Sequence, residues 1–535
     1  MSNFSATPRV WIDIYPFEGG NYRITGYDAN LLSMAVWKNI RSGQGGFTLN
    51  LAPGGPFGTN TRPYWNDIIT PSSLVVIGMQ RFSYKQIVMI GYVKPVSETT
   101  TWTNQVQRSI TIEGVDFQGF FRDFYYYTLS YLGGTQGAAL GPQGLPSLIS
   151  QSLLHGTPAA VAQAWYQKIM AGPNGILGNL AFNYRDGNPT FDSLMSSWFE
   201  AYPDDVTIPL SASFIPDEDT WDNKMRAFLP FPWYEFFVIT APVGMYGSAT
   251  PAAAPLSMDG FAPASPTLVA RVNPLPYTPF AGTISAPSFN IDTSRWDALP
   301  AFTNEGQGFL TSSLGWDASQ VRNYYCVNPF WLGSMFGESS SHLASFQNTY
   351  AVWADPASVG RYGFRPCVIP LAWFDDMNGN FAAQNTENGN SGGPFADLVA
   401  DLNLRLASYY EPSPLMLQGI GTFNLRPDIM PGCKFSFAPF KDQQEWTFYI
   451  DGVSHNYSFG GRATTTLQLT RGLPTPVYGD DALLTALHTG NAQRINGGYQ
   501  IGLSSGQQGL QALNLQSQQE LLGQLARVFV TPGQS

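Results

Sequence analysis

Two neighbouring stretches decide the fold class of this chain: WTFYIDGVSHNY at residues 446–457 and TTTLQLTRG at residues 464–472. In the first, Trp446, Phe448 and Ile450 occupy every second position, and the second alternates threonine with leucine and glutamine. A period of two is typical of a strand that buries one of its faces. The pattern therefore predicts two adjacent strands of a compact β unit.

The first 115 residues carry the same signature in shorter pieces. Breaker residues separate these pieces, as in the APGGP segment at 52–56. Short strands punctuated by glycine and proline predict a small barrel or sandwich. The expected strands lie at residues 10–14, 22–24, 47–51, 74–79, 87–93 and 109–114.

An α-rich domain is expected at residues 116–232. Residues 116–132 carry aromatic side chains on nearly every helical face, which predicts a buried helix. Thr157 and Pro158 are suited to the cap and the first position of a second helix, which runs to about residue 170. Residues 219–229 predict a third helix, followed by a strand at 233–240.

The second half of the chain alternates between loops and helices. Residues 241–300, rich in Pro, Ala and Ser, predict loops with strand fragments, and 376–393 predict a long polar loop. Residues 394–410 place apolar side chains at steps of three and four and predict a helix. The Gly- and Gln-rich tail at 475–535 contains a candidate helix at 506–529, which either binds a partner or folds back onto its own subunit.

The composition limits the class of function. The chain has 535 residues, a length that suggests three to five domains, and its net charge is 27 − 38 = −11. Charged residues make up 12% of the chain, about half the usual share, whereas aromatic residues reach 14%. A nucleic-acid reader is not expected, because phosphate binding needs clustered cations. The low charge favours permanent assembly through large interfaces, and a β-rich surface of uncharged polar residues is the alternative.

The cysteines and the apolar runs indicate a protein made in a reducing cytoplasm without a membrane span. Cys326, Cys367 and Cys433 are too scattered for a disulfide framework and are expected to be small buried residues. The N-terminus has no secretory signal pattern, and no apolar run approaches the length of a membrane helix.

No catalytic, cofactor-binding or metal site is predicted. None of the four histidines, His155, His342, His455 and His488, has another histidine three or four residues away, which excludes helical zinc motifs. The acidic pairs Glu113/Asp116 and Asp204/Asp205 fit turn and cap positions better than acid–base catalysis. Asp376, Asn378, Asn380 and Glu387 have the spacing of calcium ligands, but Phe381 stands where the sharp turn needs glycine, so a solvated loop is expected.

Several blocks of this sequence together resemble the central baseplate hub proteins of contractile-tailed phages, including the Mu-like and late-control hubs. The main block comprises Pro431-Gly432, an aromatic strand ending in Val453-Ser454-His455-Asn456-Tyr457, and the threonine-rich strand that ends in Arg-Gly at 471–472. Three further blocks follow the family's order. They are RSITIEGVD at 108–116, WDNKMRAFLPFPWYEFFV at 221–238 and DPASVGRYGFR at 355–365.

The resemblance implies a mainly β fold with α/β insertions and two related small β-barrels per subunit, which form a pseudo-hexameric ring in a trimer. It implies a first hub barrel at 1–115, the α-rich domain at 116–232, an α/β insertion at 285–414, and the tail at 475–535. The second barrel is discontinuous, at 233–284 and 415–474. The implied function is that of a non-enzymatic structural hub, which adapts a six-fold tail tube to a three-fold central spike around a channel for the genome.

The same resemblance implies the partners and the location. The subunit is expected to form a homotrimer that contacts a tail tube or tube-initiator protein, a central spike protein and other baseplate proteins. DNA is expected only in transit through the channel, and no stable membrane insertion is expected. The protein would be assembled in the host cytoplasm and reside in the tail baseplate of the virion.

The sequence leaves two alternative functions and the role of one residue undecided. A tail-associated cell-wall lysin and a receptor- or glycan-binding tail protein are the alternatives to the hub. His455 matches a motif position of the family, but no nucleophile stands near it in sequence. A structural histidine whose ring bonds to the adjoining strand is therefore the preferred interpretation.

Overall fold

The structure is a computed structural model. The residues it describes are 7–26, 30–57, 63–102, 106–127, 155–156, 158–170, 177–185, 187–200, 208–209, 218–246, 249–276, 294–304, 308–329, 352–354, 359–360, 362–371, 406, 409–410, 413, 416–439, 445–460 and 462–474. The expected calcium-like loop, the helix at 506–529, His342, His488 and the pair Asp204/Asp205 lie outside this set. So does all of the expected helix at 394–410 except three residues.

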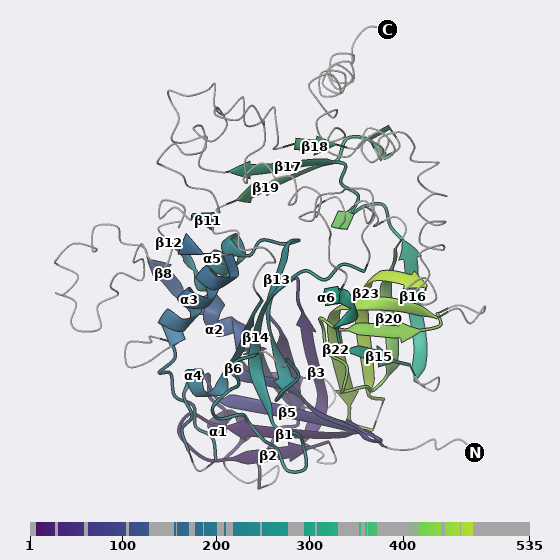
Figure 1. The fold of residues 1–535 in the computed structure, drawn as a ribbon. Coiled ribbons are helices and arrows are strands. Elements are labelled where there is room, and N and C mark those ends of the chain that lie inside the picture. The colour runs from purple at the N-terminus through teal and green to yellow at the C-terminus, as the bar shows by residue number, and fades with distance from the viewer. Residues whose placement is uncertain are drawn as a thin grey trace, which may run out of the picture.

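The described residues are mainly β structure, dominated by one large curled sheet of 13 strands (Figure 1). Its pairings are antiparallel except that of β15 with β21. The strand order along the main path is β16 (Phe309–Trp316), β20 (Leu417–Asn424), β23 (Thr464–Pro474), β22 (Trp446–Ser458), β3 (Leu31–Asn39), β4 (Gly46–Leu51), β7 (Val106–Asp116), β6 (Tyr84–Trp102), β5 (Leu74–Arg81), β1 (Arg9–Tyr15) and β2 (Tyr22–Thr25). The two remaining strands are β15 (Ala301–Thr303) and β21 (Lys434–Phe437), and β21 also pairs with β22.

The strands predicted near the two ends of the sequence form in the structure and join one another. Strand β22 pairs with β3 from Gly452 opposite Asn39 to Ser458 opposite Ser33, so the N-terminal and C-terminal halves share one sheet. The sequence analysis missed β3, because its outward residues Ala35 and Trp37 are apolar and its inward Lys38 is charged, so apolar and polar side chains do not alternate. The division into two barrels and their arrangement in a trimer stay predictions.

Four clusters of buried side chains fill the space around the curled sheet, and the smallest of them groups Phe237, Trp296 and Tyr449. One lies within the N-terminal strands and contains Ile12, Phe47 and Ile112. A second lies within the C-terminal strands around Phe435 and Phe448. A larger cluster covers the other face of the N-terminal strands with helices and with a separate sheet of three strands. That sheet has the order β10 (Ser196–Phe199), β14 (Ala264–Val272) and β13 (Tyr234–Pro242).

Two of the predicted helices form in the structure and one does not form as predicted. Helix α3 (Pro158–Met170) and helix α5 (Trp221–Phe228) confirm two predictions, and β13 follows α5 as expected. The prediction of one helix over 116–132 is wrong: α2 spans Gln118–Asp123, and β8 (Tyr125–Tyr127) follows it. Strand β8 pairs with β12 (Glu218–Thr220). The three tyrosines of β8 favour an extended chain because aromatic residues suit a strand when a partner strand is available.

Residues 241–300 contain more order than their composition predicts. All nine residues of β14 are buried, and a fully buried strand shows no alternation of apolar and polar residues. The short helices α1 (Trp65–Ile68), α4 (Phe191–Leu194) and α6 (Ser294–Asp297) complete the body around the sheets.

The remaining described strands form two small sheets away from the main one. Strand β17 (Tyr324–Pro329) pairs with β18 (Val352–Ala354) and β19 (Pro366–Leu371), and β9 (His155–Gly156) pairs with β11 (Ile208–Pro209). Among the described helices, none combines the length and the apolar character that a membrane span requires.

Candidate functional site

A cluster of buried charged groups joins the three-stranded sheet to the C-terminal strands. Glu235 on β13 and Arg271 on β14 are cross-strand partners, and both side chains are almost fully buried. Tyr449 on β22 and Arg471 on β23 reach the same carboxylate from the large sheet. We call Glu235, Arg271, Tyr449 and Arg471 the glutamate junction.

Both oxygens of the Glu235 carboxylate accept hydrogen bonds in the glutamate junction, whereas Arg471 Nε is buried without a hydrogen-bond partner among the described residues. Glu235 Oε2 accepts hydrogen bonds from Arg271 Nε at 3.0 Å and from the Tyr449 hydroxyl at 2.5 Å. Glu235 Oε1 accepts from Arg471 Nη2 at 3.3 Å. The Arg271 guanidinium also donates to the carbonyl of Gly432 and to the Tyr449 hydroxyl, each at 2.7 Å. Charged groups withdrawn from water are tolerated when hydrogen bonds satisfy them in this way.

The Arg-Gly end of the threonine-rich block has a structural explanation in this junction. Arg471 adopts a positive φ of 55°, which turns its side chain into the interior. Its Nη1 donates to the carbonyl of Pro274 at 2.7 Å, and its guanidinium lies 4.1 Å above the Tyr449 ring. A Cβ on Gly472 would overlap the Phe448 ring. Arg471 therefore supplies a buried cation, and Gly472 lets the backbone lie close to the Phe448 ring.

A second buried cluster links the N-terminal strands to α2 and α5. Lys38 on β3 donates from Nζ to Asp116 Oδ2 at 2.6 Å, to the carbonyl of Gly43 and to Gln118 Oε1. Gln118 Nε2 donates to Asp222 Oδ1 at 2.8 Å, and Arg226 Nε donates to Asp222 Oδ2 at 3.0 Å. We call Lys38, Asp116, Gln118, Asp222 and Arg226 the lysine junction.

Burial and pairing oppose each other in the lysine junction. Loss of solvent lowers the pKa of Lys38 and raises the pKa of Asp116, and the attraction between the two groups counters both shifts. Asp116 gains further support because its oxygens accept from the backbone amides of Gly45 and Gln118. Asp116 is therefore a structural anchor, while its sequence neighbour Glu113 is exposed on the other face of β7.

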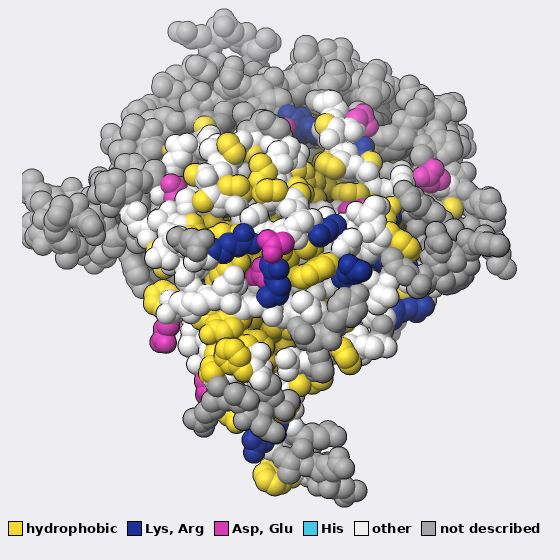
Figure 2. Space-filling view, turned by 90° about the horizontal axis from the view of Figure 1, so that it is seen from below, with side chains coloured by type: hydrophobic (Ala, Val, Ile, Leu, Met, Phe, Trp, Pro, Cys, Tyr) yellow, Lys and Arg dark blue, Asp and Glu magenta, His cyan; other side chains and the backbone are white. Residues whose placement is uncertain are grey.

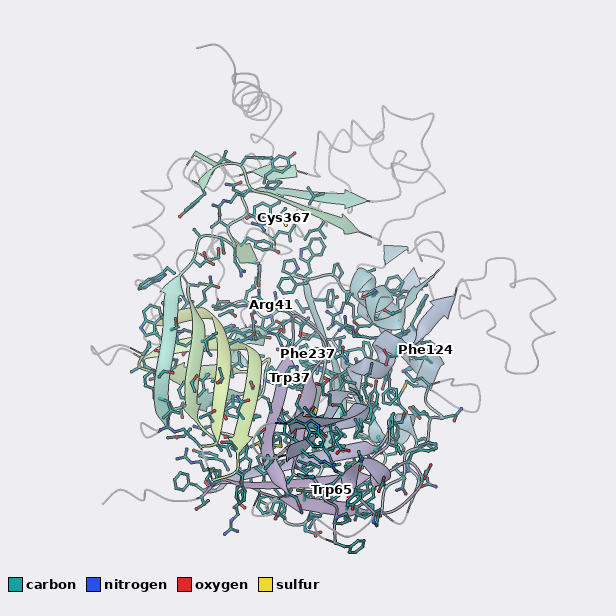
Figure 3. All side chains as sticks on the ribbon, turned by 180° about the vertical axis from the view of Figure 1, so that it is seen from behind. Trp37, Arg41, Trp65, Phe124, Phe237 and Cys367 are labelled. Carbon is teal, nitrogen blue, oxygen red and sulfur yellow. The ribbon has the colours of Figure 1, made fainter. Side chains whose placement is uncertain are left out.

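One more ion pair connects the sequence halves between these two clusters. Arg41, which follows β3, places Nε 2.6 Å from Asp451 Oδ2 on β22. Its Nη2 donates to the Tyr409 hydroxyl at 2.9 Å. Figure 3 labels Arg41 in the region between the purple N-terminal strands and the yellow-green C-terminal strands. Burial raises the pKa of Asp451, and the charge of Arg41 opposes that shift.

The structure confirms that His455 is bonded to the adjoining strand. Its Nδ1 lies 2.9 Å from Thr465 Oγ1 on β23, and the side chain is buried. Burial lowers the pKa of His455 to about 4, so the ring is neutral near pH 7. Two residues along the chain, the Tyr457 hydroxyl donates to the carbonyl of Gly26 at 2.6 Å. The V-x-H-x-Y block therefore connects β22 to β23 through His455 and to Gly26, which follows β2, through Tyr457.

The outward face of the large sheet is polar where the two halves meet, and the exposed carboxylate of Glu113 borders it opposite Thr48. A hydrogen bond of 2.8 Å runs from Asn50 Nδ2 to Ser33 Oγ, and one of 3.0 Å runs from Thr111 Oγ1 to Asn50 Oδ1. On the other side of the seam, Asn456 donates to Ser454, and the hydroxyls of Thr422 and Thr466 lie 3.4 Å apart. We call this surface the polar face and define it by Ser33, Thr48, Asn50, Thr111, Thr422, Ser454, Asn456 and Thr466.

The polar face includes a shallow depression and two apolar side chains. The depression has a volume of about 240 Å³, and Arg462 is the cation at its rim. Trp37 and Ile420 lie on the same surface and are 41% and 49% exposed. The face otherwise presents hydroxyl and amide groups that largely bond to one another.

No group of residues in the described part of the chain has the composition of a metal site. Cys367 and Cys433 are buried, and burial raises the pKa of the Cys433 thiol to about 12. The arrangement of buried charges suits the joining of segments, since both clusters lie where strands and helices from different parts of the chain meet.

The sequence analysis missed the charged members of both junctions. Lys38, Glu235 and Arg271 each stand alone among apolar residues, as in the LVARV segment of β14. A single charge inside an apolar strand is the signal that could have identified them, because such a residue is buried only with a partner. Sequence spacing does not identify that partner.

No protein-family model matches this sequence, and no curated protein matches it. Among solved structures, the tail protein of Neisseria meningitidis MC58 is similar with a TM-score of 0.40 at 12% identity, over 86% of this chain and 96% of that chain. The prophage MuSo2 tail protein of Shewanella oneidensis has a TM-score of 0.42 at 10% identity, over 87% and 98%. A type VI secretion component of E. coli has 0.34 at 7% identity, over 84% and 74%. TM-scores this low do not establish a common fold.

Replacing Glu235 with glutamine tests the glutamate junction. The change leaves Arg271 and Arg471 buried without their carboxylate, so we expect the free energy of unfolding to fall by about 3–5 kcal/mol. Asp123→Asn is the matched control, because Asp123 pairs with Lys94 at the exposed surface, where the loss should stay below about 1 kcal/mol. Denaturant unfolding followed by tryptophan fluorescence measures both. Equal losses in the two variants would contradict the assignment.

His455 makes stability depend on pH in a defined direction. The unfolded chain takes up the proton near pH 6.5 and the folded chain near pH 4, so the contribution of the neutral ring is complete above about pH 6.5 and is lost as the pH falls to 4. The loss amounts to roughly 3 kcal/mol. His455→Gln keeps a polar partner for Thr465 and should remove this part of the pH dependence. If the free energy of unfolding fell equally in the parent and in His455→Gln between pH 7 and pH 4, His455 would not be the source of the pH dependence.

Proposed function

We propose that this chain is a structural subunit of a phage tail, and specifically a hub that surrounds the genome channel of the baseplate. The observation that carries the proposal is the polar face: a sheet surface of hydroxyl and amide groups, bordered by the carboxylate of Glu113, crosses the seam between β3 and β22 and extends into both halves of the chain. A wall of this kind does not attract phosphate, so a nucleic acid can move along it without being held.

The positions of the hub-like sequence blocks support the proposal. The block at 108–116 ends in Asp116 of the lysine junction, and the block at 221–238 contains Asp222, Arg226 and Glu235. The C-terminal block supplies Tyr449, His455 and Arg471. Blocks that lie hundreds of residues apart thus meet in two buried clusters, which gives their joint presence in one sequence a physical reason.

The proposed assembly is a homotrimer in which each subunit contributes two related barrels to a pseudo-hexameric ring. The ring would hold a tail tube or tube-initiator protein on one side and a central spike on the other, with further baseplate proteins around it. The low charge of the chain supports this arrangement, because charge is depleted at the centre of large interfaces. The subunit would act without catalysis, in the baseplate of the virion.

Light scattering of the purified chain tests the assembly. We expect a particle of three times the 58.6 kDa of one chain, and negative-stain images with a ring that has an axial opening. A monomer at micromolar concentration that assembles with neither tube nor spike protein would refute the hub.

Cations introduced on the polar face test its role as the channel wall. Thr48→Lys together with Asn456→Lys adds two positive charges to the rim of the depression, and the phage should then eject its genome at least about tenfold more slowly. Thr48→Gln with Asn456→Gln is the control for side-chain size. Particle counts by electron microscopy confirm that tails assemble. Unchanged ejection from normally assembled particles would assign this face to another role.

A further inference from the structure

A group of cations gathers around strands β1, β2, β5 and β6, whereas the polar face lies on other strands of the same large sheet. Arg9 on β1 lies opposite Gln80 on β5, and Gln80 lies opposite Lys85 on β6, so the three side chains share one face of the sheet. Arg23 on β2 lies opposite Asp13 in the same layer. Figure 2 shows dark-blue side chains gathered around magenta ones near the middle of the lower face, with hydrophobic side chains between them. We call Arg9, Arg23, Lys85 and Arg185 the basic patch.

The charges of the basic patch are not balanced. Arg23 lies 2.6 Å from Asp13 and 3.0 Å from Asp259, and Arg185 lies 3.9 Å from Asp259. Four cations therefore face two carboxylates, on a chain whose net charge is −11. The hydrogen bond from Arg23 lowers the pKa of Asp259, with Arg185 and Lys85 adding to the effect, as a local positive potential requires.

Two of the four cations have no carboxylate partner within the part of the chain that the structure describes. Arg9 is exposed at the start of β1. Lys85 lies with its ammonium 4.4 Å from the centre of the Phe261 ring and 5.4 Å from that of Trp11. Trp11 and Phe261 pack edge to face at 5.2 Å and hold this cation at the surface.

We propose that the basic patch is a docking surface for a carboxylate-rich face of another protein. Arginine and aromatic side chains are enriched in protein interfaces, and arginine pairs with a carboxylate through two parallel hydrogen bonds. A nucleic acid fits less well, because its evenly spaced phosphates need a longer run of cations than the four of this patch, and Arg23 and Arg185 already face carboxylates. A symmetric contact between two copies would bring like charges together. This docking surface does not depend on the tail function proposed above.

Binding of the full-length chain to immobilised poly-L-glutamate tests the chemistry of the patch. The variant Arg9→Gln with Lys85→Gln removes its two unpaired cations, and we expect affinity to fall at least about fivefold, with the loss largest at low salt. The control Lys94→Gln with Arg108→Gln removes the same charge from exposed residues elsewhere and should bind as the parent does. Arg9→Gln alone affects no packed side chain and should give an intermediate loss.

Three results would overturn the proposal. The first is an equal loss of affinity in the patch variant and the control. The second is duplex DNA binding more tightly than poly-L-glutamate at the same salt, which would make the patch a phosphate site. The third is a change in the mass of the patch variant in sedimentation, which would make the patch a contact between copies. Since the trimer is measured in the same sedimentation run, failure of the hub assembly is seen separately from failure of this surface.

Discussion

The Glu235 carboxylate is the group on which the arrangement of the described body depends. It lies on β13, and it accepts from Arg271 on β14 and from Tyr449 and Arg471 on the C-terminal strands. A buried carboxylate with two arginines is stable only as a complete set, because removing one member leaves a charge without solvent or partner. The three-stranded sheet and the C-terminal strands are therefore fixed relative to each other by geometry that apolar packing alone does not impose.

The lysine junction and the Arg41–Asp451 pair extend the same principle to the rest of the molecule. Lys38 and Arg41 lie at the end of β3 and just after it, next to the place where β3 pairs with β22. Two strands pair through backbone groups that every residue possesses, so the backbone alone allows several registers. A buried ion pair is satisfied only when its two side chains meet, so it selects one register. The chain is poor in charge, yet it uses several charged groups inside, where they determine which segments meet.

The distribution of charge also distinguishes two groups of strands in the large sheet. The polar face satisfies its hydroxyl and amide groups among themselves, so little remains to bind a passing molecule. The basic patch instead displays cations with too few carboxylates, supported by Trp11 and Phe261. The strands of the polar face suit sliding contact, and the strands of the basic patch suit a lasting one.

The sequence by itself determined the fold class, most strands at the two ends of the chain, and helices α3 and α5, because these depend on local periodicity and capping. It also indicated that His455 bonds to its neighbouring strand. Strand β3 was missed because apolar residues face outward and Lys38 faces inward, and β14 because a fully buried strand has no alternation. The extent of α2 was missed because the strand partner of β8 is distant in sequence. Only the tertiary structure decided that Glu235 meets Arg271 and Arg471, and that the halves of the chain share one sheet. Those contacts join residues far apart in sequence, and no local pattern records the distance between them.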